Sequence, residues 1–150
     1  MGVELTPAEI DAYLLASPRV ILCVARKNKA PLPMPMWFGW IERKIVMTTL
    51  QASRKVGPIR SNPQVACLVE SGQEYFSLKA ILMMGTCEVV DDQEQVSNWQ
   101  ERIFDNKPMY KSLFPAQLPP HLERFYSRPR SALIVTPTTV TSWDFANIPR

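Results

Sequence analysis

The chain has 150 residues, of which 46% are hydrophobic and 21% charged, a composition typical of a folded globular protein. This length is enough for one domain with a hydrophobic core, so we expect residues 1–150 to form a single domain. The net charge is +3, and Lys and Arg are spread along the chain, which argues against nucleic acid as a partner.

The beginning of the chain and its cysteines bear on the compartment. Met1-Gly2-Val3-Glu4 lacks the basic and apolar regions of a signal peptide, and no apolar stretch approaches the roughly 18 residues of a membrane span. Cys23, Cys67 and Cys87 are widely spaced in apolar runs, so we expect buried, reduced thiols. The sequence therefore predicts a cytoplasmic protein with no membrane partner.

A helix is expected near the start of the chain. Thr6 can cap it, Pro7 suits the first helical position, and Glu9 can complete a capping box. The Ser17-Pro18 pair ends this helix, because proline disfavours a helical residue before it.

The rest of the chain alternates mainly between strands and turns. We expect six strands, over residues 19–25, 30–40, 45–50, 64–70, 75–90 and 130–144. Gly85 marks a bulge or bend in the fifth strand. Antiparallel hairpins dominate and no βαβ alternation is present. The fold class is therefore mainly β, a small barrel with helices on its rim.

Prolines give the second expected strand a special character. Pro31, Pro33 and Pro35 remove every second backbone N–H on one side of the strand. This strand must therefore leave one edge unpaired, or facing something other than a neighbouring strand.

Three further helices are expected between the strands. Ser53 should open a short helix that ends near Asn62-Pro63, and Asp91-Asp92 should cap a longer one. Residues 121–126 form a further helical piece, preceded by a Pro-rich loop.

The end of the third strand is a candidate anion site. Thr48 and Thr49 end the strand, Ser53 follows at the expected helix start, and Arg54 and Lys55 lie in its first turn. A helix N-terminus attracts anions, and two cations placed there would be stabilised by a phosphate. The alternative is a solvated, serine-capped helix with surface cations, and the chemistry of these residues leaves both interpretations open.

Other side chains offer weaker signals. Met36 and Trp37 in the proline-rich strand, and Trp143 at the end of the last strand, could contact a flat ring or could belong to the core. His121 is the single histidine and is expected to be exposed and without a role. No catalytic side chain and no metal ligands can be assigned, so an enzyme of this sequence would need a cofactor to carry the chemistry.

Taken in order, these segments resemble the FMN-binding split-barrel family, the pyridoxamine 5'-phosphate oxidase-like flavoproteins. The matching segments are residues 19–25 (first strand), 31–38 (ending P-x-W-F), 48–55 (T-x(4)-S-x-K), 62–66 (N-P-x-V-A), 85–92 (G-x-A/C-E-x-x-D-D) and 140–145 (W-D-F). Any one of these motifs is weak, whereas six in the family's order are a specific signal.

The resemblance implies a six-stranded antiparallel split barrel that forms a homodimer, with FMN bound at the dimer interface. It also implies cofactor-binding roles for nine residues. These are Ser53, Arg54 and Lys55 for the phosphate, Thr48 and Thr49 for the phosphate or ribityl chain, Met36 and Trp37 for the isoalloxazine ring, and Lys79 and Trp143 from the other subunit.

The family's R-x-H substrate element is missing, since Arg128-Pro129-Arg130 has no histidine, which argues against vitamin B6 oxidation. The preferred interpretation is an FMN-dependent oxidoreductase that transfers hydride through flavin N5 and acts on a small-molecule substrate. Two alternatives remain open: a deazaflavin-dependent reductase, and a non-enzymatic flavin-binding, haem-binding or sensor protein.

Overall fold

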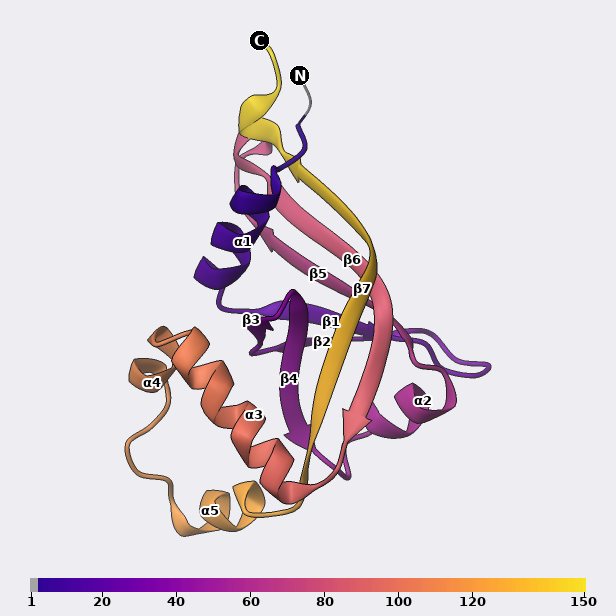
Figure 1. Cartoon of the computed structure of the whole chain (residues 1–150), viewed down its shortest axis with the longest axis vertical. Coiled ribbons are helices and arrows are strands. Elements are labelled where there is room, and N and C mark those ends of the chain that lie inside the picture. Colours follow the sequence, from indigo (N-terminus) through magenta and orange to yellow (C-terminus); the bar gives the residue numbers. More distant parts are fainter. Residues whose placement is uncertain (1–2) are drawn as a thin grey trace.

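An antiparallel sheet that curls on itself forms the body of the molecule (Figure 1). The computed structural model describes residues 3–150, and within them the sheet has seven strands in the order β2-β1-β5-β6-β7-β4-β3. The strands are β1 Val20–Val24, β2 Leu32–Met36, β3 Gly39–Ile41, β4 Lys44–Leu50, β5 Gln64–Ser71, β6 Lys79–Val90 and β7 Arg130–Asp144.

The strand count is seven where six were expected, because the run 30–40 splits in two. Its first part, β2, pairs with β1, whereas its second part, β3, pairs with β4 at the opposite edge of the sheet. Only Trp37 and Phe38 separate the two edge strands in the chain. The sheet must therefore curl until its edges lie close together, which produces the split barrel.

The proline-rich strand occupies an edge, as the sequence predicts. Pro33 lies opposite Cys23 and Pro35 opposite Ile21, and β2 has no partner other than β1 in the order of the described sheet. Both prolines are exposed, so their missing N–H groups interrupt no ladder.

The longest ladder joins β6 to β7 and runs the length of the molecule. Its register goes from Lys79 opposite Asp144 to Val90 opposite Ala132, with a shift between Met84 and Gly85. The predicted bulge at Gly85 is confirmed. The start of this strand was expected at residue 75, but Tyr75–Ser77 form a turn of 3-10 helix, so β6 begins at Lys79.

The helices are α1 Pro7–Ala16, α2 Val56–Ser61, α3 Gln93–Asn106, α4 Met109–Leu113 and α5 Pro120–Tyr126. In Figure 1, α1, α3, α4 and α5 lie on one side of the sheet, and α2 lies on the other side near the end of β6. The caps predicted at Thr6 and Asp92 are confirmed, and Thr6 forms the capping box with Glu9. The sequence does not predict α4. Among residues 3–150, no helix has the length and apolar character required to cross a bilayer.

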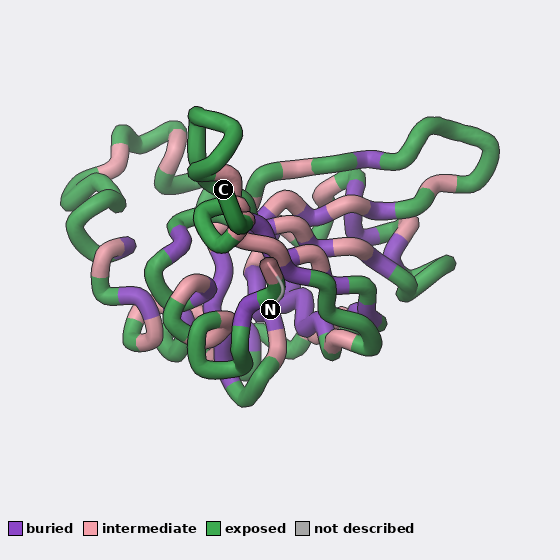
Figure 2. Tube along the Cα trace, turned by 90° about the horizontal axis from the view of Figure 1, so that it is seen from above, coloured by how far each residue is buried: buried purple, intermediate pink, exposed green. Residues whose placement is uncertain are grey.

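Buried side chains divide between the two faces of the curled sheet. Met47 packs inside the barrel, whereas Val46 packs on the outer face with Ile103 of α3 and Tyr110 of α4. Figure 2 shows buried residues gathered along the central strands and exposed residues on the surrounding loops. Because side chains alternate along a strand, Thr48 follows Val46 on the outer face and Thr49 follows Met47 on the inner one.

Candidate functional site

Three cations approach one another where β4 leads into α2. The Lys55 amine donates to Thr49 Oγ1 over 2.8 Å and to Ser53 Oγ over 2.7 Å, and only 5% of Lys55 is exposed. Burial lowers the pKa of Lys55, and the charges of Arg130 and Arg54 lower it further. Within the described chain, none of these three cations forms an ion pair with a carboxylate.

This corner differs from the expectation in one respect. Ser53 was expected to open the helix, but α2 begins at Val56, and Ser53 lies in the preceding turn. The N-cap position belongs to Lys55, whose backbone is itself helical and whose side chain makes no capping hydrogen bond. The chain needs additional residues to leave β4, so the helix starts later, and attraction for an anion rests on the side-chain charges.

Arg130 joins the corner from the first position of β7. It lies opposite Leu50 in the ladder, and its guanidinium donates to Thr48 Oγ1 over 3.4 Å. The Thr48 hydroxyl also contacts Gln100 Oε1 of α3. Burial lowers the pKa of Arg130. No sequence motif marks Arg130 or Gln100 as part of this site, since only contacts between distant segments bring them to Thr48.

A hollow of about 610 Å³ opens beside this corner, between β4 and the segment that carries α3, α4 and α5. Its flat walls are aromatic and its polar groups gather at one side. The lining residues are Trp37, Phe104, Phe114 and Tyr126, the polar Thr48, Gln100 and Arg130, and Ile103, Leu113 and Pro115. The size and composition are those of a small-molecule site, with few polar groups among apolar walls.

Stacked aromatic rings support the wall of this hollow. The Trp37 ring lies 4.3 Å from that of Tyr110 with an angle of 5° between the planes, and Phe114 meets Trp37 edge-on at 6.5 Å. Met36, predicted beside Trp37, instead packs against the core inside the barrel. Of these two residues, Trp37 lines the hollow and Met36 does not.

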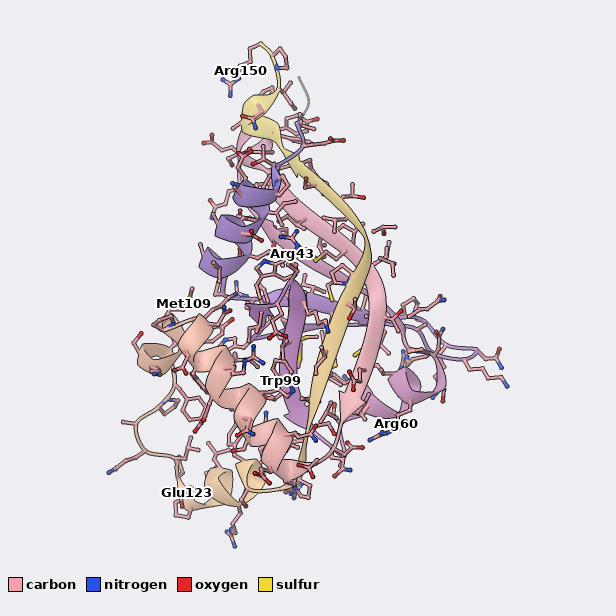
Figure 3. All side chains as sticks on the ribbon, viewed as in Figure 1. Arg43, Arg60, Trp99, Met109, Glu123 and Arg150 are labelled. Carbon is pink, nitrogen blue, oxygen red and sulfur yellow. The ribbon has the colours of Figure 1, made fainter. Side chains whose placement is uncertain are left out.

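Lys79 and Trp143 lie far from the corner. Lys79 pairs with Asp144 and Trp143 with Ala80, at the other end of the β6–β7 ladder from Val90. At roughly 3.3 Å per residue, the length of β6 separates the two ends by roughly 35 Å. Figure 3 shows the elongated shape of the molecule, with Arg150 at one end and Glu123 of α5 at the other.

Lys79 also has local partners. Its amine lies 3.8 Å from Asp144 Oδ2 and 4.7 Å from the centre of the Tyr13 ring. A single chain therefore assembles Thr48, Thr49, Ser53, Arg54 and Lys55 in one place, with Trp37 in the adjoining hollow, but does not add Lys79 and Trp143.

The remaining predicted features have simple surroundings. His121 is exposed on α5, as expected. Cys67 and Cys87 are buried, and burial raises the pKa of each thiol to about 12, whereas Cys23 is half-buried.

The donor set at the corner fits a phosphate group. The buried Lys55, the half-buried Arg130 and the exposed Arg54 supply positive charge, and the hydroxyls of Thr49 and Ser53 supply further hydrogen bonds. Guanidinium and ammonium groups free of carboxylates are the usual partners of phosphate oxygens.

Comparison with solved structures finds the same fold in several other proteins. A conserved hypothetical protein from Mycobacterium tuberculosis superposes with a TM-score of 0.80 at 21% identity, over 99% of this chain and 92% of that one. An FAD-binding protein from Mesorhizobium loti gives 0.67 at 16% identity, over 92% and 94%. An F420 reductase gives 0.62 at 23% identity, over 85% and 93%.

The sequence comparisons identify the family. No curated protein matches the chain. The sequence model of the pyridoxamine 5'-phosphate oxidase family, however, matches residues 6–144, which include all seven strands of the described sheet and the cation corner. The chain therefore belongs to the pyridoxamine 5'-phosphate oxidase family.

Proposed function

We propose that the protein is an FMN-dependent oxidoreductase. The observation that carries this proposal is the junction of two features at Arg130, which lines the aromatic hollow and also lies close enough to lower the pKa of Lys55. An elongated ligand with an anion at one end and a flat ring at the other fits this arrangement.

The cation corner would hold the phosphate of FMN. Ser53, Arg54, Lys55 and Arg130 would surround its oxygens, and the lysine amine would exchange its contact with Thr49 for a charged partner. Binding an anion would also offset the unfavourable proximity of the three cations.

The ribityl chain and the ring would extend into the hollow. The hydroxyl of Thr48 and the amide of Gln100 lie between the corner and the aromatic walls, where they could bond to ribityl hydroxyls. Trp37 would face the ring, and the surrounding aromatic side chains would exclude water. When bound, the flavin supplies hydride transfer at N5, while the chain binds, orients and shields it.

A second copy of the chain would complete the site. Lys79 and Trp143 lie at the opposite end of the molecule from the corner, so their predicted role requires a homodimer in which each end meets the other end of its partner. Light scattering of the flavin-loaded protein tests this part of the proposal, and a stable loaded monomer would contradict it.

The main rival cofactor is a deazaflavin. The structural likeness to an F420 reductase makes F420 the alternative to test, and such a cofactor would use the same corner and hollow. Titration of apo-protein with FMN and with F420, followed by quenching of tryptophan fluorescence, separates the two. Tighter binding of F420 would replace FMN in the proposal.

Removal of the two adjacent cations tests the phosphate site. We expect Arg54→Ala combined with Lys55→Ala to weaken FMN binding by at least about 2 kcal/mol, or roughly 30-fold, because two charge-assisted contacts are lost. Lys27→Ala combined with Lys29→Ala, on the exposed β1–β2 turn, removes the same charge elsewhere and should leave the affinity within about threefold. Equal affinities in the two double variants would refute the assignment.

A further inference from the structure

Lys107 is a lysine without solvent exposure at the end of α3. Its amine donates to the carbonyl of Ser17 over 2.5 Å and lies 3.2 Å from the centre of the Phe38 ring. In the described chain it forms no ion pair. The nearby carboxylate of Asp105 is exposed and pairs with Lys111 on the surface, at 3.6 Å.

Tyr110 makes the neighbouring contact. Its hydroxyl donates to the carbonyl of Pro18 over 2.7 Å and accepts the N–H of Phe38 over 3.1 Å. Lys107 and Tyr110 thus reach two consecutive carbonyls of the α1–β1 turn. Both also contact Phe38, which follows Trp37 in the link between β2 and β3.

Packing alone does not explain a lysine at this position. An ammonium group has three donors, and the structure supplies one acceptor and the faces of two rings, Phe38 at 3.2 Å and Tyr110 at 5.7 Å, so burial of the charged form is costly. A methionine would fill a similar space without that cost. The amine is therefore best explained by what it holds in place.

We propose that Lys107 is a positioning residue for the aromatic wall: its amine, held by Ser17 and Phe38, keeps Tyr110 stacked on Trp37 in the orientation that receives a flat ring. The part that concerns the ring rests on the proposed flavin function. The part that concerns the wall does not, because the stack is formed by Trp37 and Tyr110 of the chain itself.

The protonation state of Lys107 decides how firmly the wall is held. Burial lowers its pKa to about 7, and no other group contributes to that shift, while Arg19 is the charge that acts on Tyr110. The closed wall therefore favours the neutral amine. Protonation below neutrality favours conformations in which water reaches the ammonium group, which loosens the Trp37–Tyr110 stack.

The first experiment uses the protein without ligand. In 5-fluorotryptophan-labelled protein, with the Trp37 signal assigned from Trp37→Phe, we expect the ¹⁹F shift of Trp37 to titrate with a midpoint near pH 7. Lys107→Met should abolish this titration. Lys111→Met, at an exposed lysine four residues away, should preserve it.

The second experiment measures FMN affinity between pH 6 and pH 8. The phosphate of FMN also titrates in this range, so Lys107→Met serves as the control for its contribution. From pH 8 to pH 6 we expect the affinity of wild type to fall by at least about threefold more than the affinity of Lys107→Met. Lys107→Met should bind more weakly than wild type at pH 8, because the anchor at Ser17 is lost.

The outcomes separate the two proposals. A Trp37 signal that does not titrate near neutrality, or that titrates equally in Lys107→Met, would overturn the positioning role. If no flavin binds at any pH, the flavin function fails and the ¹⁹F result still decides the role of Lys107. Should Lys107→Met not fold, the ¹³Cε shift of Lys107 in ¹³C-lysine-labelled wild type tests the positioning role. A titration of Lys107 at the ordinary value near pH 10.4 would refute that role.

Discussion

The guanidinium of Arg130 donates to Thr48 Oγ1 over 3.4 Å, although 82 residues separate the two in the chain. The pairing of β4 with β7 produces this contact, since Arg130 and Leu50 form the pair at the end of that ladder. It links the cation corner to the aromatic hollow, and therefore the two ends of the proposed flavin site.

Replacement of Arg130 tests that link. We expect Arg130→Gln to weaken FMN binding by about 1.5 to 3 kcal/mol, since one charge-assisted contact to phosphate is lost. Arg128→Gln, two residues earlier and exposed, should have little effect. Isothermal titration calorimetry of both variants measures the difference, and an unaltered affinity in Arg130→Gln would remove this residue from the site.

The buried Lys107 predicts a pH dependence of stability. The folded-state pKa is about 7, whereas the unfolded chain keeps the ordinary value of 10.5, so folding is accompanied by proton release between these values. The free energy of unfolding should rise with pH over this window. The full cost of burying the protonated Lys107 amine should be present below pH 7.

Lys107→Met removes this penalty. We expect the variant to exceed wild type in free energy of unfolding by roughly 3 to 5 kcal/mol at pH 6, with the difference vanishing toward pH 10.5. Urea denaturation at several pH values measures it. A constant difference across the range would show that Lys107 does not titrate with a lowered pKa.

The bulge in β6 predicts a sharp intolerance at Gly85. A Cβ added there would lie 2.5 Å from the carbonyl oxygen of Thr136 and 3.0 Å from Cγ1 of Val135. We expect Gly85→Ala to lower the free energy of unfolding by about 1 to 3 kcal/mol. Gly57→Ala in α2 meets no atom within 4 Å and should raise it by up to about 1 kcal/mol. Thermal denaturation of the two variants measures these changes. Equal changes in the free energy of unfolding for Gly85→Ala and Gly57→Ala would contradict the bulge geometry.

The three cysteines should differ in reactivity. Burial raises the pKa of Cys67 and Cys87 to about 12, so few thiolates form at pH 8, whereas Cys23 is half-buried in β1. We expect a thiol reagent to modify Cys23 first in the folded protein, and all three after denaturation. Peptide mass spectrometry identifies the modified site, and rapid modification of Cys67 would show that the barrel opens readily.

Local features of the fold could be predicted because local chemistry determines them. The alternation of prolines places β2 at an edge, Thr6 and Asp92 cap their helices, and Gly85 accommodates a close approach of backbone. Where the predictions were wrong, tertiary contacts prevailed. The run 30–40 divides because its two parts pair with different strands, and α2 starts three residues after Ser53 because the turn out of β4 requires those residues.

The sequence by itself determined the class of fold, the family and the segment that carries Ser53, Arg54 and Lys55, because these depend on residue types at short spacing. Only the tertiary structure decided what surrounds that segment. It brought Arg130 to Thr48 and stacked Trp37 on Tyr110. It also placed Lys79 at the far end of β6 from the cation corner. Contacts between residues far apart in the chain follow from the register and curl of the whole sheet, which no short stretch of sequence encodes.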